Sequence, residues 1–186
     1  MENKEEILEL VRQYLKKFRD EDSDVHPLIQ FLKDHEGEAL INRKNFSGHI
    51  TTSAFIINES ASHLLLLNHK SLNRWLQPGG HVDITDPSLH ASAIREACEE
   101  TGLAAENLVL LSREVFDIDS HHIPENYKKQ EPAHTHHDIR FLFKCSNAQS
   151  LNISLEESTD SEWVPFSELK TNHDFFWVDE KIKSFE

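Results

Sequence analysis

The spacing of the apolar residues changes near His49, and this change constrains the fold more than any other feature of the chain. Before His49, apolar residues recur every three or four positions, as at Ile7 and Val11. This period predicts amphipathic helices over residues 4–20 and about 27–34, separated by a polar break. After His49, short runs rich in β-branched residues predict strands instead. The chain should therefore combine a helical N-terminal segment with an α+β domain.

The part after His49 predicts strands separated by turns and one longer helix. The predicted strands cover residues 50–57, 63–68, 108–117 and 139–145, and a short helix follows residues 163–166 near the end of the chain. The longer helix should begin at Asp86, which can cap it, with Pro87 in its first turn and Gly102 at its end. Residues 118–138 are predicted to form a polar loop, and a loop of that length is usually functional or mobile.

Length and composition fit one domain of ordinary make-up, with 186 residues, 38% apolar and 28% charged. Cys98 and Cys145 lack the spacing of a zinc motif or a disulfide framework, which favours a reducing compartment. The charged start of the chain lacks the apolar region of a signal peptide, and no apolar run approaches the ~20 residues that span a bilayer. We therefore expect a cytoplasmic protein without a membrane partner. The sequence leaves the oligomeric state open.

The net charge of −14, counted with neutral histidines, limits the partners of the chain. Such a chain repels duplex nucleic acid and anionic membranes, so we expect neither as a partner. It also repels a phosphorylated small molecule. A substrate of that kind would therefore need a bound cation or a locally basic patch.

Three glutamates with helical spacing, Glu96, Glu99 and Glu100, are the candidates for holding such a cation. On a helix they share one face, within an arc of about 100°. Like charges this close repel each other, and a hard divalent cation such as Mg²⁺ or Mn²⁺ would remove that repulsion. The alternative reading of these three residues alone is a solvated helix face.

The surrounding residues favour the metal. The run from Gly79-Gly80-His81-Val82-Asp83 to Arg95-Glu96-Ala97-Cys98-Glu99-Glu100-Thr101-Gly102-Leu103 resembles the Nudix box, G-x5-E-x7-R-E-U-x-E-E-x-G-U, where U is a bulky aliphatic residue. The second half matches except at the small Ala97. The first half does not, because Asp86 is the nearest acid to the first glutamate of the pattern and the stretch to Arg95 is one residue too long. A simple N-cap is the alternative role for Asp86.

The resemblance covers residues 47 to 180 and implies an α/β/α sandwich with a mixed sheet, in which the box forms a loop-helix-loop. It divides the chain into a helical extension, 1–45, and a Nudix hydrolase domain, 46–186. The implied activity is metal-dependent hydrolysis of a nucleoside diphosphate linked to another moiety, with Mg²⁺ or Mn²⁺ as cofactor.

The resemblance also implies roles for individual residues. Glu96, Glu99 and Glu100 would bind the metal, with Glu96 and Glu99 also acting in catalysis. Arg95 would hold a box glutamate in place through a bidentate pair. The glycine pair, Gly79 and Gly80, would turn the backbone sharply next to the substrate.

Histidines provide a second group of candidates, because most of the 13 lie between His49 and His137. His134 and His136 alternate with Asp138, so on an extended chain their side chains face the same way. We expect His81, His134 and His136 to serve the metal, and Glu131 to be a candidate general base. The alternative is a solvated loop.

Basic residues should bind the anionic substrate, and Arg74 and Arg140 are the preferred candidates. Lys70, Lys128 and Lys129 also flank the proposed site in sequence. Two other functions stay open at this stage. The histidines allow an enzyme similar to isopentenyl diphosphate isomerases, and the fold allows a Nudix-like module that binds a nucleotide without cutting it. The intact glutamates favour hydrolysis over both.

Overall fold

The computed structural model describes residues 2–127, 130–146, 151–171 and 174–185. The helices are α1 (Lys4–Lys17), η1 (Arg19–Glu21), α2 (Asp22–Asp34), η2 (Gly37–Leu40), α3 (Leu89–Thr101), η3 (Ala105–Asn107), α4 (Phe166–Leu169) and α5 (Val178–Lys183). The strands are β1 (His49–Asn58), β2 (His63–His69), β3 (Arg74–Leu76), β4 (Gly79–His81), β5 (Leu108–Leu110), β6 (Asp117–Ile123), β7 (His134–Cys145) and β8 (Ser158–Pro165). Among the described residues, no helix is both long and apolar enough to cross a membrane.

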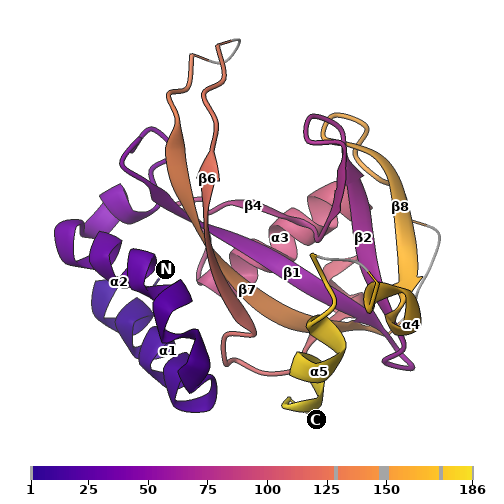
Figure 1. Cartoon of the computed structure of the whole chain (residues 1–186). Helices are drawn as coiled ribbons and strands as arrows, with labels where there is room; N and C mark the ends of the chain where they lie inside the picture. Colours follow the sequence, from indigo (N-terminus) through magenta and orange to yellow (C-terminus); the bar gives the residue numbers. More distant parts are fainter. Residues whose placement is uncertain (1, 128–129, 147–150, 172–173, 186) are drawn as a thin grey trace. The chain divides into compact units, whose positions relative to one another are not determined.

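The strands form one sheet in the order β3-β2-β1-β7-β5, with β4 paired to β1, β6 to β7 and β8 to β2. The hairpin pairs are antiparallel, whereas β1 and β7 run in the same direction (Figure 1), so the sheet is mixed. This confirms the predicted α+β class. The chain divides into two compact units. Unit 1 comprises Met1–Ser53, Gly80–Ala93 and Glu114–Arg140, and unit 2 comprises Ala54–Gly79, Ile94–Arg113 and Phe141–Glu186.

In unit 1, the N-terminal helices form where the sequence predicts them. Asn3 starts α1 with a capping box, in which its side chain accepts from the backbone of Glu6 and the Glu6 carboxylate accepts from the backbone of Asn3. The buried face of α1 packs against α2. The predicted polar break, residues 20–24, is helical instead: its start lies in η1, and its end forms the first turn of α2, which has Pro27 inside it.

The same unit contains the largest departure from the predicted elements. Residues 118–138 are largely a β-hairpin, in which β6 pairs with β7 from Asp117↔Arg140 to Ile123↔His134 (Figure 1). The prediction of a polar loop was therefore wrong. Strand β6 is rich in Asp and His, so its composition does not indicate a strand. It forms because it pairs with β7, and strand formation depends more on such pairing than on composition.

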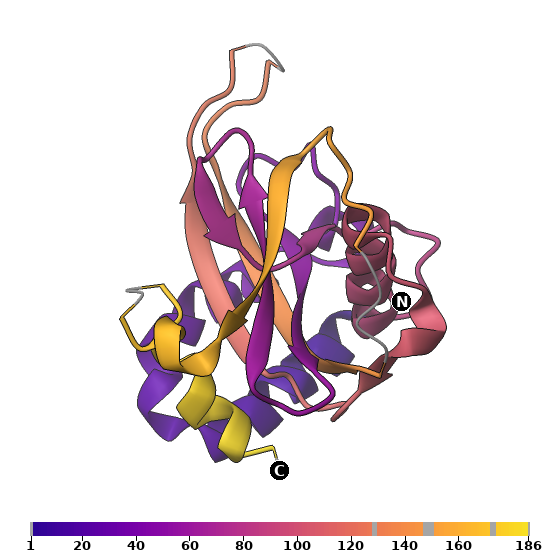
Figure 2. The same cartoon turned by 90° about the vertical axis from the view of Figure 1, so that its right-hand side faces the viewer.

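In unit 2, β2 pairs with β8 along its whole length (Figure 2). All four leucines of the run 64–67 are buried. The Phe55 ring contacts the rings of Phe175 and Trp177 at centroid distances of 6.2 and 5.6 Å. These aromatic contacts attach the segment before α5 to the core of unit 2.

Two predictions around the box helix need correction. Helix α3 begins at Leu89, and Ser88 caps it, since the Ser88 Oγ accepts from the Ala91 N–H at 3.2 Å. Asp86 instead closes the preceding loop by accepting from the Asp83 N–H at 2.9 Å. The glycine pair, residues 79 and 80, lies in strand β4 without positive φ angles, so it does not form the predicted sharp turn.

Candidate active site and histidine cluster

The three box glutamates of α3 occupy different environments within unit 2. Arg95 donates to Glu96 at 2.8 Å and to Glu99 at 3.3 Å, so one guanidinium orients both carboxylates. Glu99 is mostly exposed, whereas Glu100 is buried. The Oε2 atom of Glu100 accepts from the backbone N–H of Gly79 at 3.0 Å. Gly79 therefore acts through its amide, by holding a box carboxylate.

A fourth carboxylate, Glu157, joins this group in unit 2. Burial first, and then the neighbouring Glu157 and Glu96 carboxylates, raise the pKa of Glu100 to about 8, although the Gly79 amide acts in the opposite direction. Burial also raises the pKa of Glu96, against the effect of Arg95. Glu157 was not predicted, because no motif marks it and only the fold places it beside α3. We call Glu96, Glu99, Glu100 and Glu157 the carboxylate cluster.

The carboxylate cluster has the donor chemistry of a divalent-cation site. A buried acid with a raised pKa beside a second acid shows that the negative charges are poorly compensated by the protein alone. Carboxylate oxygens are the ligands that hard cations such as Mg²⁺ prefer. A cation bound here would offset the repulsion and favour the ionised form of Glu100.

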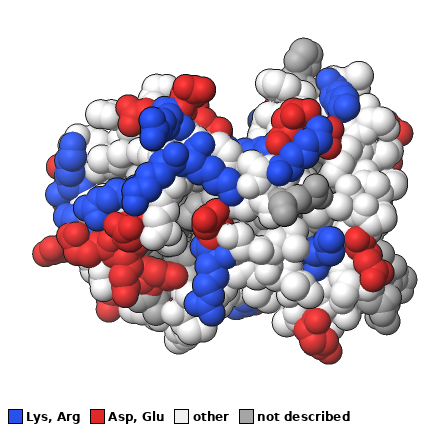
Figure 3. Space-filling view, turned by 90° about the horizontal axis from the view of Figure 1, so that it is seen from below, with Lys and Arg blue, Asp and Glu red and all other residues white. Residues whose placement is uncertain are grey.

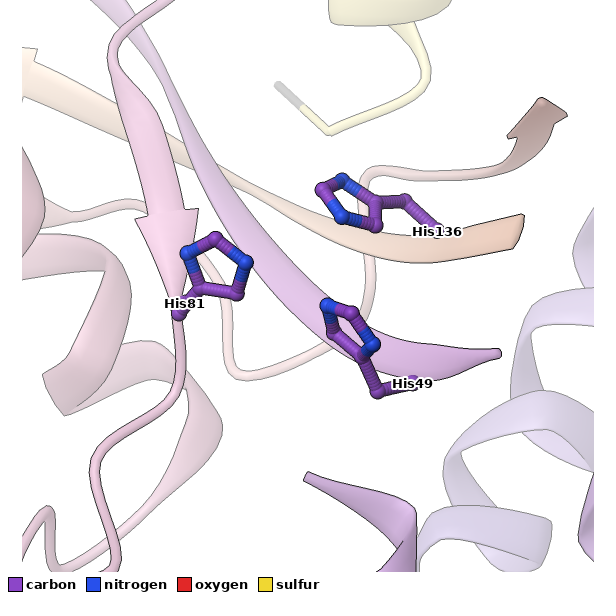
Figure 4. Close-up of side chains that lie close together, drawn as sticks. All are labelled: His49, His81 and His136. Carbon is purple, nitrogen blue, oxygen red and sulfur yellow. The ribbon is translucent and has the colours of Figure 1, made fainter. Parts of the chain in front are cut away.

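A second group of titratable residues lies in unit 1. One ligand nitrogen from each of His49, His81 and His136 lies within 4.8 Å of the others, and the rings come from strands β1, β4 and β7 (Figure 4). We call these three residues the histidine cluster. Burial is the first cause that lowers the pKa of His81 to about 4 and that of His136 to about 2, and the neighbouring imidazoles lower both further. Burial is also the first cause that lowers the pKa of His49, so all three rings are neutral near pH 7.

His134 lies beside this cluster, and its Nε2 atom is 3.2 Å from that of His136. Its ring stacks on His49 at a centroid distance of 5.1 Å. The structure thus brings together the predicted His81, His134 and His136, and adds His49, which was not predicted as a site residue. Side chains alternate between the two faces of β1 as they do in β7. The position of His49 beside His136 follows only from the pairing of β1 with β7, which the sequence does not show.

Comparison with known proteins matches residues 48–183 to the NUDIX domain family. A curated relative, the "Probable DHNTP pyrophosphohydrolase" of Lactococcus lactis subsp. cremoris (strain MG1363), is 31% identical over 123 residues, which cover 66% of this chain and 69% of that protein. The chain belongs to the Nudix family.

Solved structures with the same fold include the E. coli dihydroneopterin triphosphate pyrophosphohydrolase, with a TM-score of 0.56 at 15% identity over 73% of this chain and 93% of that one. A C. elegans Ap4A hydrolase complex has a TM-score of 0.54 at 20% identity, with the same two coverages. These likenesses support the fold. The activity rests instead on the family match and the curated relative, which support a Nudix pyrophosphohydrolase that acts on a phosphorylated small molecule. Divalent metal ions are a general requirement of the family. The isomerase and the non-catalytic sensor are not favoured.

In this Nudix domain, Arg140 has a role different from the predicted one. Its Nε, NH1 and NH2 atoms each donate at 2.8 Å, to Asp138, Asp117 and Asp119 respectively. Burial alone would lower the pKa of Arg140, but the three carboxylates raise it above its usual range. Asp138 also accepts from Ser53 at 2.7 Å, so Asp138 serves this buried network. Arg140 is therefore a structural cation, and we no longer assign it to the substrate.

The other predicted residues have simpler surroundings. Glu131 forms an ion pair with Arg43 at 3.1 Å in unit 1. Arg74 forms an exposed ion pair with Asp174 at 2.8 Å in unit 2. Their roles as base and substrate ligand stay predictions. Lys128 and Lys129 lie outside the described residues.

Proposed function

We propose that this Nudix enzyme uses Mg²⁺ or Mn²⁺ to cleave a phosphoric anhydride bond in a nucleoside diphosphate derivative or in a pterin triphosphate. Dihydroneopterin triphosphate is the first candidate, because the curated relative at 31% identity is described as a probable pyrophosphohydrolase of DHNTP. The observation that carries the metal dependence is the pairing of the buried Glu100 with Glu157. We also propose that residues 1–45 form an extension of the Nudix domain and that the enzyme works in the cytoplasm.

Individual residues are given the following roles. Glu96, Glu99 and Glu100 would hold the cation, and Glu157 supplies a further carboxylate beside Glu100. When bound, a divalent cation offsets the charge of the diphosphate and lowers the pKa of a water molecule. Arg95 keeps Glu96 and Glu99 oriented, which reduces the rotamer freedom that binding would otherwise have to remove.

The remaining roles concern the substrate and the attacking water. The amide of Gly79 positions Glu100, and Gly80, the next residue of the same short strand, is a candidate substrate contact. Arg74 carries a positive charge for the phosphates. Glu131 is the candidate general base, and His81, His134 and His136 are candidate metal ligands.

The first test compares Glu99→Gln and Glu100→Gln with Glu106→Gln, whose side chain is exposed in η3 of the same unit. Turnover should fall at least about 100-fold in the two box variants, which corresponds to ~2.7 kcal/mol of barrier. Glu106→Gln should match the wild type. The free energy of unfolding in chelator should change little, because without a metal ion the raised pKa of Glu100, about 8, already leaves this carboxyl mostly uncharged near pH 7. Unchanged turnover in both box variants would exclude the carboxylate cluster as the metal site.

A second test addresses the substrate. Dihydroneopterin triphosphate, nucleoside triphosphates, nucleotide sugars and dinucleoside polyphosphates would be compared at equal Mg²⁺ by the release of pyrophosphate, phosphate or nucleoside monophosphate. We expect the highest kcat/KM with the pterin triphosphate. A higher value with a nucleotide sugar would redirect the substrate assignment but leave the metal assignment intact.

A further inference from the structure

We propose that His49, His81 and His136 form a second metal site, in unit 1, for a transition metal ion that prefers imidazole ligands, with Zn²⁺ as the reference ion. It is separate from the carboxylate cluster in both its ligands and its chemistry. Imidazole nitrogens favour Zn²⁺, Cu²⁺ and Ni²⁺, whereas carboxylates favour Mg²⁺ and Mn²⁺. The enzyme would therefore hold two kinds of metal ion.

The geometry of the three imidazole ligands supports a metal site. The three rings come from three strands and approach each other at centroid distances of 4.6 to 5.3 Å (Figure 4). Their nitrogens lie within 4.8 Å of one another. Tetrahedral zinc with Zn–N bonds of about 2.05 Å requires nitrogens ~3.3 Å apart. Small rotations of the three side chains would bring the nitrogens to that separation.

One ring nitrogen of His49 has no hydrogen-bond partner in the part of the chain that the structure describes. Its Nδ1 faces the backbone carbonyl of Asn45 at 3.4 Å, which favours the tautomer with the proton on Nδ1. The Nε2 atom then presents a lone pair. His49 is fully buried, and among the described residues its Nε2 is the one buried side-chain nitrogen or oxygen atom without a hydrogen-bond partner. A metal ion would give this nitrogen a partner that the protein itself does not supply.

His134 lies close enough to His136 to be a further ligand of the same metal ion. A carbonyl oxygen, that of Pro132, lies 2.7 Å from its Nδ1, while its Nε2 faces that of His136 at 3.2 Å. This is close to the nitrogen separation of two imidazoles on one zinc ion. His134 is therefore the candidate fourth ligand, and water is the alternative.

The test is a titration of the metal-free full-length protein with Co²⁺ in the presence of excess Mg²⁺, so that Mg²⁺ occupies the carboxylates. Tetrahedral cobalt with imidazole ligands gives a strong visible ligand-field band, and Zn²⁺ should remove it by displacement. His81→Ala and His136→Ala should weaken Co²⁺ binding at least about 100-fold. His122→Ala is the matched control, because His122 is an exposed neighbour in the same hairpin. It should bind Co²⁺ like the wild type.

Glu99→Gln separates this inference from the proposed function, because it should abolish hydrolysis but keep the cobalt band. Circular dichroism would verify that each variant is folded. X-ray absorption of the wild-type protein with one equivalent of Zn²⁺ needs no variant, and it should show at least three imidazole ligands. A shell of oxygen ligands alone, or wild-type Co²⁺ affinity in both His81→Ala and His136→Ala, would overturn the second site whether or not the enzyme hydrolyses diphosphates.

Discussion

Arg140 illustrates how burial decides what a charged side chain does. Burying a guanidinium lowers the stability of the fold unless carboxylates compensate its charge. Arg140 lies within β7, and three aspartates accept hydrogen bonds from it. The same three aspartates would repel each other without the arginine. The network therefore connects β6 to β7 and its charges cannot be removed singly without leaving others uncompensated.

We predict that Arg140→Ala lowers the free energy of unfolding by about 3–5 kcal/mol, because it leaves buried carboxylates unpaired. Arg113→Ala, at an exposed position, should change it by less than about 0.5 kcal/mol. Urea denaturation followed by circular dichroism would measure both. Equal stabilities of the two variants would mean that the three aspartates are solvated in solution.

The buried phenol of Tyr14 makes stability depend on alkaline pH. Its hydroxyl group donates to Glu21 and, at 3.3 Å, to Asp117. Burial first, then the charges of Asp117 and Glu21, raise the pKa of Tyr14 above its usual range. The folded state thus keeps a proton that the unfolded chain releases above pH ~10. The stabilisation is complete below that pH and is lost as pH rises, at up to about 1.4 kcal/mol per pH unit.

The prediction is that Tyr14→Phe is less stable than the wild type at neutral pH, and that this difference shrinks above pH ~10. Tyr127→Phe is the control, since Tyr127 is 82% exposed and the chain has only these two tyrosines. Urea midpoints between about pH 8 and about pH 11 would give both slopes. A constant difference between Tyr14→Phe and wild type across this range would refute the account.

At the residue level, the sequence predicted the box glutamates because a helix converts spacing of three and four into a shared face. It could not predict Glu157, His49 or the partners of Arg140. Each of these depends on which strands and loops meet, and the residues that meet are far apart in the sequence.

At the scale of elements, the end of α3 depends on Gly102. Its φ of +72° is a conformation that side chains disfavour, and an added Cβ would lie 2.8 Å from the carbonyl oxygen of Asn152. Gly37 has a similar φ of +59° but nothing within 4 Å of an added Cβ. The two glycines therefore separate backbone strain from steric contact.

Gly37→Ala should lower the free energy of unfolding by about 1 kcal/mol, from backbone strain alone. Gly102→Ala should lower it by a further ~1–3 kcal/mol, because Asn152 and its backbone must move. Thermal and urea unfolding of the two variants would measure the difference. An equal decrease in the free energy of unfolding in both variants would indicate that Asn152 moves away from the added Cβ without destabilising the fold.

The predicted elements were most accurate where the apolar period was strong, as in α1, β1 and β2. They failed where polar residues form a strand through pairing, as in β6, and where Ser88 rather than Asp86 caps α3. Capping depends on the local path of the chain, and several polar residues before a helix are chemically able to cap it.

At the scale of the whole molecule, charge and metal binding are connected. Basic side chains gather on one face beside acidic ones (Figure 3), although the net charge is −14. A cation that binds only the folded protein raises the free energy of unfolding by about 2.7 kcal/mol when its free concentration is 100 times its Kd. Metal addition should therefore raise the melting temperature of this acidic chain.

We predict that Mg²⁺ raises the melting temperature of the wild type and that EDTA reverses the increase. The increase should be much smaller in Glu100→Gln and unchanged in Glu106→Gln, since only Glu100 belongs to the carboxylate cluster. Differential scanning calorimetry at constant ionic strength would separate binding from screening. An equal increase in all three proteins would reduce the effect of Mg²⁺ to general screening.

The hairpin of β6 and β7 sets where this enzyme can tolerate changes in chain length. Alternate residues of β7 face opposite sides, so His134, His136, Asp138 and Arg140 share one face while His137 packs on Phe31 at a centroid distance of 4.7 Å. Residues inserted between Asn126 and Glu131, which pair with each other across the hairpin, would cost little more than loop closure. One residue inserted within β7 would exchange the two faces, and would move imidazoles and charges to the apolar side in a single mutational step. Natural variants and engineered loops should therefore differ in length at the tip of the hairpin and keep the residue count of β7 constant.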